Sequence, residues 1–318
     1  MFCSCLGPEW SQHGSLYVDG THWHYTRGMT FMETNHKMAV CCWERPTGGR
    51  GAVEIHQAST DGQYHIRYTV RSPRRNWRPW DVAEVGGYLY VICSYDSKVY
   101  RFPCMESVEE RTTFRLLPDD GDTQVQPYCI SYNKLTDKLV VCLEHQGKCK
   151  VVEYFLPDFK CHTISALDST PSSTSSIDIN EEDNRAYIVM RNDSGVYVVG
   201  RDMETLCSLQ VPSNCTCDVV AFGKGPLAGQ IFLGCESFGQ ESIYRYIGDA
   251  KSRYVLSGCI VEGLKVPSER GMVISKDGDI AISERMGHTV RIFQPHSEIH
   301  DDPEIHDEED EPELMIDD

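Results

Sequence analysis

The chain has 318 residues, of which 48 are acidic and 30 are basic, giving a formal net charge of −18 at pH 7. Twelve of the acids lie in residues 297–318, which contain no Lys or Arg, so the rest of the chain carries 36 acids against 30 bases and is only mildly acidic. This balance argues against a DNA-binding protein, which needs a strongly basic footprint. No apolar run reaches the roughly 18 residues of a membrane span, so we expect no membrane insertion.

The cysteine content indicates a reducing compartment. There are 15 Cys, an odd number, and several lie inside apolar runs, where a thiol behaves as a small hydrophobic side chain. The N-terminus MFCSCLGPEWSQHG has neither the basic nor the apolar region of a signal peptide. We therefore expect free thiols and a cytoplasmic protein.

Taken in chain order, the sequence repeats a four-strand unit about every 40 to 55 residues. Each unit begins with a short strand, expected at 29–31, 80–82, 128–130, 176–178, 217–219 and 272–274. A stronger apolar strand follows, at 38–42, 88–93, 138–143, 185–190, 230–235 and 279–283. Third strands are expected at 52–56, 98–102, 149–155, 195–199, 242–246 and 289–293. Weaker fourth strands are expected at 64–70, 112–117, 161–167, 205–211 and 254–261.

The sixth unit has no fourth strand after Phe293. The N-terminal stretch GSLYVD at 14–19 belongs to no unit, and we expect Ser15 to Val18 to supply the missing strand. Such a closure joins the first and last units and removes an exposed sheet edge. The predicted fold is all-β, a six-bladed propeller of four-stranded blades over residues 1–296.

Two polar stretches lie outside the strand pattern. Residues 168–176, DSTPSSTSS, predict a flexible surface connector between the third and fourth blades. Residues 297–318 have the composition of a disordered acidic tail. Its carboxylates could fold back and compete for a basic site, and a purely solubilising tail is the simpler interpretation.

The blade pattern resembles the NHL repeat. The stretches GMVI at 271–274, IAISE at 280–284 and TVRIF at 289–293 match that motif, and 79–82, 88–91 and 99–102 match it partly. The Asp that usually ends the second strand and the loop Asn are missing, and the other four units keep only the spacing. The resemblance implies a propeller like the C-terminal module of tripartite-motif proteins, although no RING, B-box or coiled-coil pattern occurs here.

What the resemblance implies is a non-catalytic scaffold that docks a protein or peptide, working alongside ubiquitin-ligase or post-transcriptional regulatory machinery. Some NHL propellers bind RNA, which is the alternative for this chain.

Arginines recur just before the first strand of three units, at Arg27, Arg78 and Arg270. Equivalent positions of a propeller gather at one mouth of its channel, so these side chains should share a face. The predicted binding face comprises Arg27, Arg71, Arg74, Arg75, Trp77, Arg78, Trp80, Arg270, Arg285 and His288. Arg pairs with carboxylates or phosphates in bidentate geometry and Trp stacks, so the pattern favours an anionic partner. The alternative is a set of solvated loop arginines with the Trp side chains packed between blades.

Three aspartates leave open the alternative that the protein is a calcium-dependent enzyme. Asp81, Asp178 and Asp218 lie near the starts of first strands, where six-bladed calcium-dependent lactonases hold their metal. No Asn accompanies them, and no hydrolase or nucleotide-binding motif occurs. We therefore expect no cofactor and no enzyme, with a calcium-dependent hydrolase as the second alternative.

Overall fold

The computed structural model describes the strands and most of their connections. The described residues are 10–17, 25–33, 36–43, 51–60, 63–71, 77–93, 96–105, 112–117, 125–156, 158–166, 174–180, 185–190, 195–200, 205–237, 240–248, 254–264, 271–283 and 289–295.

These residues form six antiparallel four-stranded sheets, which we call blades one to six. Blade one contains β2 (Tyr25–Phe31), β3 (Lys37–Trp43), β4 (Gly51–Ala58) and β5 (Tyr64–Arg71). Blade two contains β6 (Pro79–Val85), β7 (Tyr88–Cys93), β8 (Lys98–Pro103) and β9 (Thr112–Arg115). Blade three contains β10 (Val125–Asn133), β11 (Lys138–His145), β12 (Lys148–Phe155) and β13 (Lys160–Ala166).

The second half of the chain repeats this arrangement. Blade four contains β14 (Thr174–Asn180), β15 (Arg185–Met190), β16 (Gly195–Val199) and β17 (Thr205–Leu209). Blade five contains β18 (Thr216–Phe222), β19 (Gln230–Ser237), β20 (Gln240–Gly248) and β21 (Tyr254–Leu264), with one 3-10 turn, η1 (Gly225–Leu227). Blade six contains β22 (Met272–Ile274), β23 (Ile280–Ser283), β24 (Thr289–Pro295) and the N-terminal strand β1 (Trp10–Tyr17).

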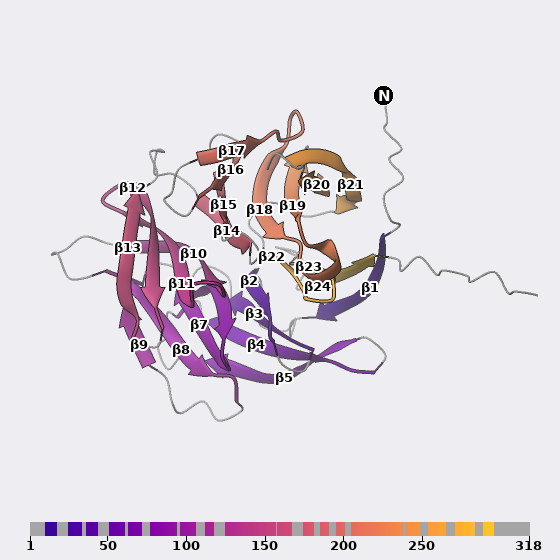
Figure 1. The fold of residues 1–318 in the computed structure, drawn as a ribbon. Helices are drawn as coiled ribbons and strands as arrows, with labels where there is room; N and C mark the ends of the chain where they lie inside the picture. The colour runs from indigo at the N-terminus through magenta and orange to yellow at the C-terminus, as the bar shows by residue number, and fades with distance from the viewer. Residues whose placement is uncertain are drawn as a thin grey trace, which may run out of the picture.

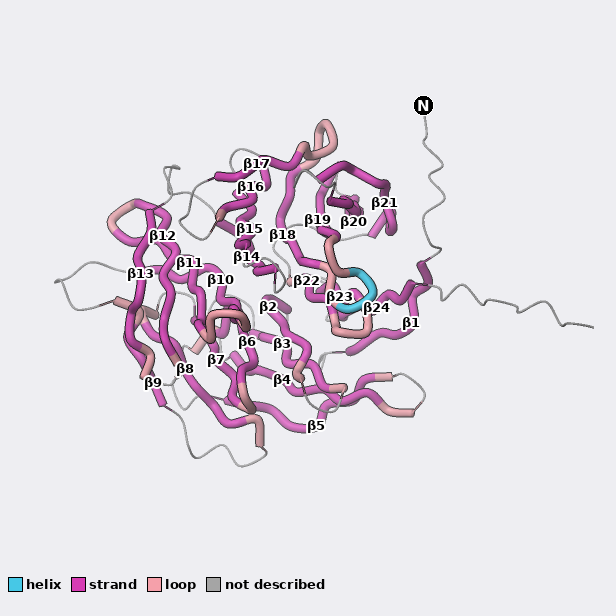
Figure 2. Tube along the Cα trace, viewed as in Figure 1, coloured by secondary structure: helices cyan, strands magenta, loops and turns pink. Residues whose placement is uncertain are grey.

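The first strand of each blade lies innermost, and these six strands close into a ring (Figure 1). Each of β2, β6, β10, β14 and β18 contacts the next, and β22 contacts β2. The predicted all-β propeller is therefore confirmed. Strands account for nearly all the regular structure in the described residues (Figure 2).

The N-terminal strand closes the ring, as predicted. Strand β1 pairs antiparallel with β24 in a register that runs from Trp10 opposite Pro295 to Tyr17 opposite Thr289. The strand begins earlier than the sequence indicated, at Trp10 rather than Ser15, and Val18 lies outside the described residues. The Trp10 ring also meets Phe232 of blade five edge to face at 6.2 Å, which ties the closing strand to its neighbour.

The core fills the spaces between neighbouring blades. Second strands are buried on both faces, as β3 and β7 show, because each blade is sandwiched between two others. Cys41, Cys42, Cys93, Cys142 and Cys235 lie in these strands and are buried. Their small apolar side chains fit the tight packing between sheets.

The prediction of a polar connector at residues 168–176 is partly wrong. Strand β14 begins at Thr174, so the last three residues of that stretch belong to the innermost strand of blade four. Pairing with Met190 and Val189 of β15 overrides their polar composition. Residues 168–173 and the predicted tail at 297–318 lie outside the described residues.

Candidate binding site at the channel mouth

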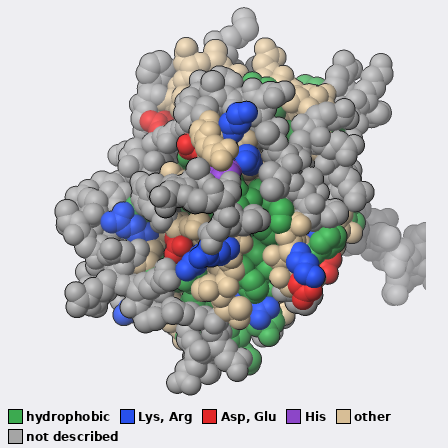
Figure 3. Space-filling view, turned by 90° about the vertical axis from the view of Figure 1, so that its left-hand side faces the viewer, with side chains coloured by type: hydrophobic (Ala, Val, Ile, Leu, Met, Phe, Trp, Pro, Cys, Tyr) green, Lys and Arg blue, Asp and Glu red, His purple; other side chains and the backbone are tan. Residues whose placement is uncertain are grey.

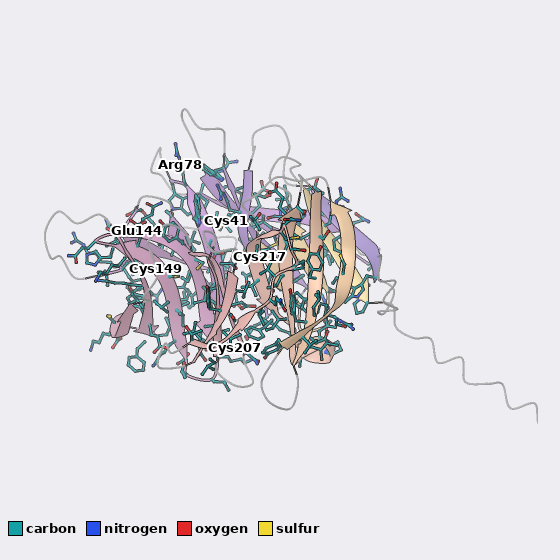
Figure 4. All side chains as sticks on the ribbon, turned by 90° about the horizontal axis from the view of Figure 1, so that it is seen from above. Cys41, Arg78, Glu144, Cys149, Cys207 and Cys217 are labelled. Atoms are coloured by element: carbon teal, nitrogen blue, oxygen red, sulfur yellow. The ribbon has the colours of Figure 1, made fainter. Side chains whose placement is uncertain are left out.

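All six innermost strands begin at the same end of the ring, which we call the mouth. Second strands end there and third strands begin there, because neighbouring strands of each blade are antiparallel. Figure 4 shows Arg78 at this end and Cys207, near the start of the outer strand β17, at the opposite end.

The innermost strands carry β-bulges close to the mouth. The pairing register shifts between Thr26 and Met29 in β2, between Pro79 and Asp81 in β6, and between Pro127 and Cys129 in β10. Strands β14 and β18 shift at the corresponding place. A bulge turns the extra residue out of the regular alternation. At the mouth the bulge residues with described side chains are Arg27 in β2, Trp80 in β6 and Tyr128 in β10.

Two arginines and two tryptophans form a cluster of cation–π and ring contacts at the mouth, which we call the Arg–Trp ladder. The Cζ atom of Arg27 lies 4.0 Å from the centroid of the Trp80 ring and 5.5 Å from that of Trp43. The Cζ atom of Arg78 lies 5.3 Å from the Trp43 ring on the same ladder. The two indole rings are 6.2 Å apart and tilted by 50°. Each guanidinium is therefore held by cation–π contacts, and its planar fork is oriented in advance.

The ladder is only partly open to solvent. Arg27 is 7% exposed and Trp43 is buried, whereas Arg78 and Trp80 are half-buried. Arg27 is thus a buried part of the ladder, and Arg78 and Trp80 form the part that solvent or a ligand can reach. Trp43 ends β3 opposite Tyr25. Sequence reasoning missed Trp43, although its position at the mouth end of a second strand was a usable signal.

Close backbone approach brings the ladder strands together. A Cβ atom on Gly28 would lie 2.5 Å from Cα and 1.8 Å from Oδ1 of Asp81 in the next blade, so glycine is required for this contact. On the other side, a Cβ on Gly271 would lie 2.6 Å from the Arg27 carbonyl oxygen. Ser283 Oγ accepts a hydrogen bond of 2.9 Å from the Gly271 N–H and is fully buried. These contacts fix the backbone that carries Arg27.

The other predicted site residues fall into three groups. Trp77 is 2% exposed and packs edge to face on Tyr100 and Phe102, so its place on the binding face was wrong and it belongs to the core. Arg71 is exposed at the mouth end of β5, away from the ladder strands. The side chains outside the described residues are those of Arg74, Arg75, Arg270, Arg285 and His288.

Asp81 and Asp178 connect neighbouring blades. In Asp81, Oδ1 accepts from the Val82 N–H and Oδ2 from the Ile130 N–H of blade three, each at 2.9 Å. In Asp178, Oδ1 accepts from Ile179 at 2.9 Å and Oδ2 from Phe222 of blade five at 2.8 Å. Both oxygens of each carboxylate accept hydrogen bonds from backbone N–H groups. Asp81 thereby links β6 to β10, and Asp178 links β14 to β18.

The environment of Asp81 changes its titration. Removal from water raises the pKa of the carboxyl to about 7; the two backbone donors act in the opposite direction, and Asp178 adds a further increase. Asp218 lies within β18, but its side chain is outside the described residues. Among the described residues, no group of three or more His, Cys, Asp and Glu side chains is placed to hold a metal ion.

Tyr128 and Glu144 form a second polar element at the mouth that sequence reasoning missed. The Tyr128 hydroxyl donates to Oε2 of Glu144 at 2.6 Å. Burial, and then the hydrogen bond to Glu144, raises the pKa of this hydroxyl, so it stays a donor at neutral pH. The position of Tyr128 matches that of Trp80 in the preceding blade, which was the signal available in the sequence.

Comparisons with known proteins support the fold alone. A scan of protein-family models and a search of curated proteins returned no match. Among solved structures, a streptogramin B lyase aligns with TM-score 0.54 at 13% identity over 90% of this chain and 97% of the other. A catalytically inactive variant of virginiamycin B lyase from Staphylococcus aureus, solved with quinupristin, aligns with TM-score 0.54 at 12% identity over 90% and 99%.

A protein of unknown function from Bacteroides thetaiotaomicron gives TM-score 0.59 at 13% identity over 89% of this chain and 75% of the other. No helix in the described part of the chain is long and apolar enough to cross a membrane. At these identities the structural matches show a shared β-propeller fold, and the NHL resemblance stays a prediction. The chain is therefore established as an all-β propeller with an Arg–Trp ladder at its mouth.

Proposed function

We propose that this propeller is a non-catalytic binding module that docks an anionic segment of a protein partner at the Arg–Trp ladder. The observation that carries the proposal is the set of cation–π contacts in the ladder, in which Arg27 lies 4.0 Å over Trp80 and Arg78 lies 5.3 Å over Trp43. Guanidinium groups bind carboxylates through two parallel hydrogen bonds. A guanidinium that is already oriented loses less freedom on binding, which favours affinity.

Partial burial strengthens this arrangement. Arg27 is 7% exposed, and the half-buried Arg78 lies beside the same indole ring. Charges that are partly removed from water are less screened by salt than exposed surface charges. The ladder therefore offers a carboxylate a stronger contact than solvated loop arginines would offer.

RNA binding is the first alternative, since phosphates suit the same guanidinium groups and the half-buried Trp80 could stack on a base. The mildly acidic composition outside residues 297–318 favours the protein partner. Calcium-dependent hydrolysis is less favoured, because Asp81 and Asp178 already use both carboxylate oxygens on backbone N–H groups. A lyase activity like that named for the structural neighbours is not proposed, because the likeness to them lies in the fold alone.

The test is fluorescence anisotropy of the full chain with a labelled decaglutamate peptide. Arg78→Gln removes the accessible guanidinium and should weaken binding about tenfold, as expected for a hydrogen-bonded charge. Lys134→Gln is the matched control, because Lys134 is exposed in the turn between β10 and β11 at the opposite end of the ring. Equal losses in both variants would refute the site. A single-stranded RNA decamer serves as the second probe, and tighter binding of RNA than of peptide would replace the protein partner with RNA.

A further inference from the structure

Blade five brings two cysteine side chains into contact at its mouth end. Cys217 lies at the start of β18, and Cys235 lies near the end of β19. Their Sγ atoms are 2.7 Å apart. This is closer than the 3.5 Å between the Sγ atoms of Cys142 and Cys149, a thiol pair in blade three. The blade-five pair lies outside the Arg–Trp ladder, which blades one and two supply, so the binding site described above does not use it.

The backbone places the blade-five pair within reach of a disulfide bond. Cys217 and Cys235 are directly opposite each other in the antiparallel register of β18 and β19. Opposed residues of such a pair have Cα atoms about 4.5 or 5.5 Å apart. Both values lie inside the range of roughly 4.4–6.8 Å that disulfides require between Cα atoms. A bond between these two sulfurs therefore needs no shift of strand register.

In blade three, the opposed position and the 3.5 Å sulfur contact involve different cysteines. In the register of β11 and β12, Cys142 is opposite Val151 and Cys149 is opposite Glu144, so the two thiols are diagonal. Diagonal positions have Cα atoms about 7–8 Å apart, which is too far for a disulfide without backbone movement. Cys142 is directly opposite Cys129 of β10 instead. Cys217 and Cys235 combine both features in one pair.

Burial distinguishes this pair from an ordinary reactive thiol. Cys217 and Cys235 are each 1% exposed and belong to the core between blades four and five. Cys161, in contrast, is exposed on β13, on the side of the ring turned toward the viewer in Figure 3. Thiol exchange depends on access, so the buried pair should react only while the chain folds or when blade five opens locally. The same burial then protects the bond from reduction.

We propose that Cys217 and Cys235 are a disulfide-forming site, with a small disulfide such as oxidised glutathione as the oxidant. The thiolate of one cysteine attacks the small disulfide, which forms a mixed disulfide and releases one small thiolate. The second cysteine then attacks the protein sulfur of the mixed disulfide and releases the second small thiolate. Two electrons pass from the protein to the oxidant, and the two S–H protons end on the two released thiols.

The cross-link joins the innermost strand of blade five to its neighbour. The pairing register of β18 and β19 shifts between Cys217 and Val219, so the bond lies beside a bulge that interrupts the ladder of hydrogen bonds. Closing the loop from Cys217 to Cys235 restricts the unfolded chain and stabilises the folded one. The oxidised protein is therefore the more stable form. This inference is independent of the proposed function, because it involves neither the ladder nor its ligand.

The experiment exposes the full chain to a buffer of oxidised and reduced glutathione, once as the native protein and once during refolding from urea. Remaining thiols are alkylated, and a tryptic digest is analysed by mass spectrometry without reduction. Trypsin leaves Cys235 in residues 225–245, and leaves Cys217 in residues 202–224 together with Cys207 and Cys215. Two variants identify the partner: Cys217→Ala removes it, and Cys215→Ala is the matched control, two residues away and 8% exposed.

We expect residues 202–224 linked to 225–245 in the wild type and in Cys215→Ala, and not in Cys217→Ala. The link should form at least tenfold more slowly in the native protein than the glutathione adduct of Cys161. It should also raise the unfolding temperature of the wild type by about 3–5 °C. The inference is overturned if neither arm yields the link while Cys161 is modified, or if the link persists in Cys217→Ala.

Discussion

Arg27 carries a stabilising role that follows from its surroundings. Its guanidinium lies 4.0 Å over the Trp80 ring and the residue is 7% exposed, so its removal leaves a gap beside the two indole rings. Loss of a partly desolvated cation–π contact and of stem packing predicts that Arg27→Ala lowers the free energy of unfolding by about 1–2 kcal/mol. Arg71→Ala, at an exposed position, should stay within about 0.5 kcal/mol. Urea unfolding of both variants measures this, and equal effects would contradict the stacked geometry.

The raised pKa of Asp81 predicts that the stability of the protein depends on pH. Its pKa of about 7 in the folded protein lies above the value of about 3.9 for an unfolded chain. The folded state therefore binds the proton more tightly, and this contribution is present below pH 4 and is lost as the pH rises through 7. The free energy of unfolding of the wild type, minus that of Asp81→Asn, should fall between pH 4 and pH 7 and stay constant above. A difference that does not vary with pH would contradict the elevated pKa.

At the scale of the strand, Gly28 sets the distance between β2 and β6. A Cβ atom there would meet Oδ1 of Asp81 at 1.8 Å and its Cα at 2.5 Å, and the backbone cannot yield by rotating a side chain. Gly28→Ala should therefore cost about 1–3 kcal/mol of unfolding free energy. Gly195→Ala is the matched control, because its nearest neighbours are atoms of the Tyr197 side chain at 3.2 Å. Comparable losses in the two variants would argue against the close approach.

The strands could be predicted well because each is a short alternating or continuously apolar run bounded by turn residues. The expected second strand at 88–93 coincides with β7, and the expected first strand at 272–274 coincides with β22. The mouth was predicted less well, since burial there depends on side chains from other strands. Arg27 was expected on an open face, but Trp43 from β3 and Trp80 from β6 enclose it. Trp77 was expected beside it, but packing on Tyr100 and Phe102 draws that ring into the core.

For the whole molecule, closure of the ring depends on the N-terminal strand. Strand β1 covers β24, which would otherwise be an exposed edge able to pair with another chain. Deletion of residues 1–17 should therefore lower the unfolding temperature and promote association, whereas deletion of residues 1–9 removes nothing from β1 and should do neither. Thermal unfolding and light scattering after size exclusion measure both effects. A monomeric 1–17 deletion with unchanged unfolding temperature would contradict a closing role for β1.

The two ends of the molecule differ in chemistry. The mouth carries the Arg–Trp ladder, whereas exposed apolar side chains such as Met105, Phe155 and Val255 lie toward the opposite end. An acidic partner is therefore expected at one end and not at the other. The connectivity brings the ladder residues to one end, because every innermost strand starts at the mouth.

The most direct measurement is hydrogen exchange of the full chain with and without decaglutamate peptide, which locates the binding site without any substitution. The account predicts slower exchange at the mouth, in the segments that start β2 and β6. Protection confined to the opposite end, around Met105 or at the start of β21, would contradict a site at the Arg–Trp ladder.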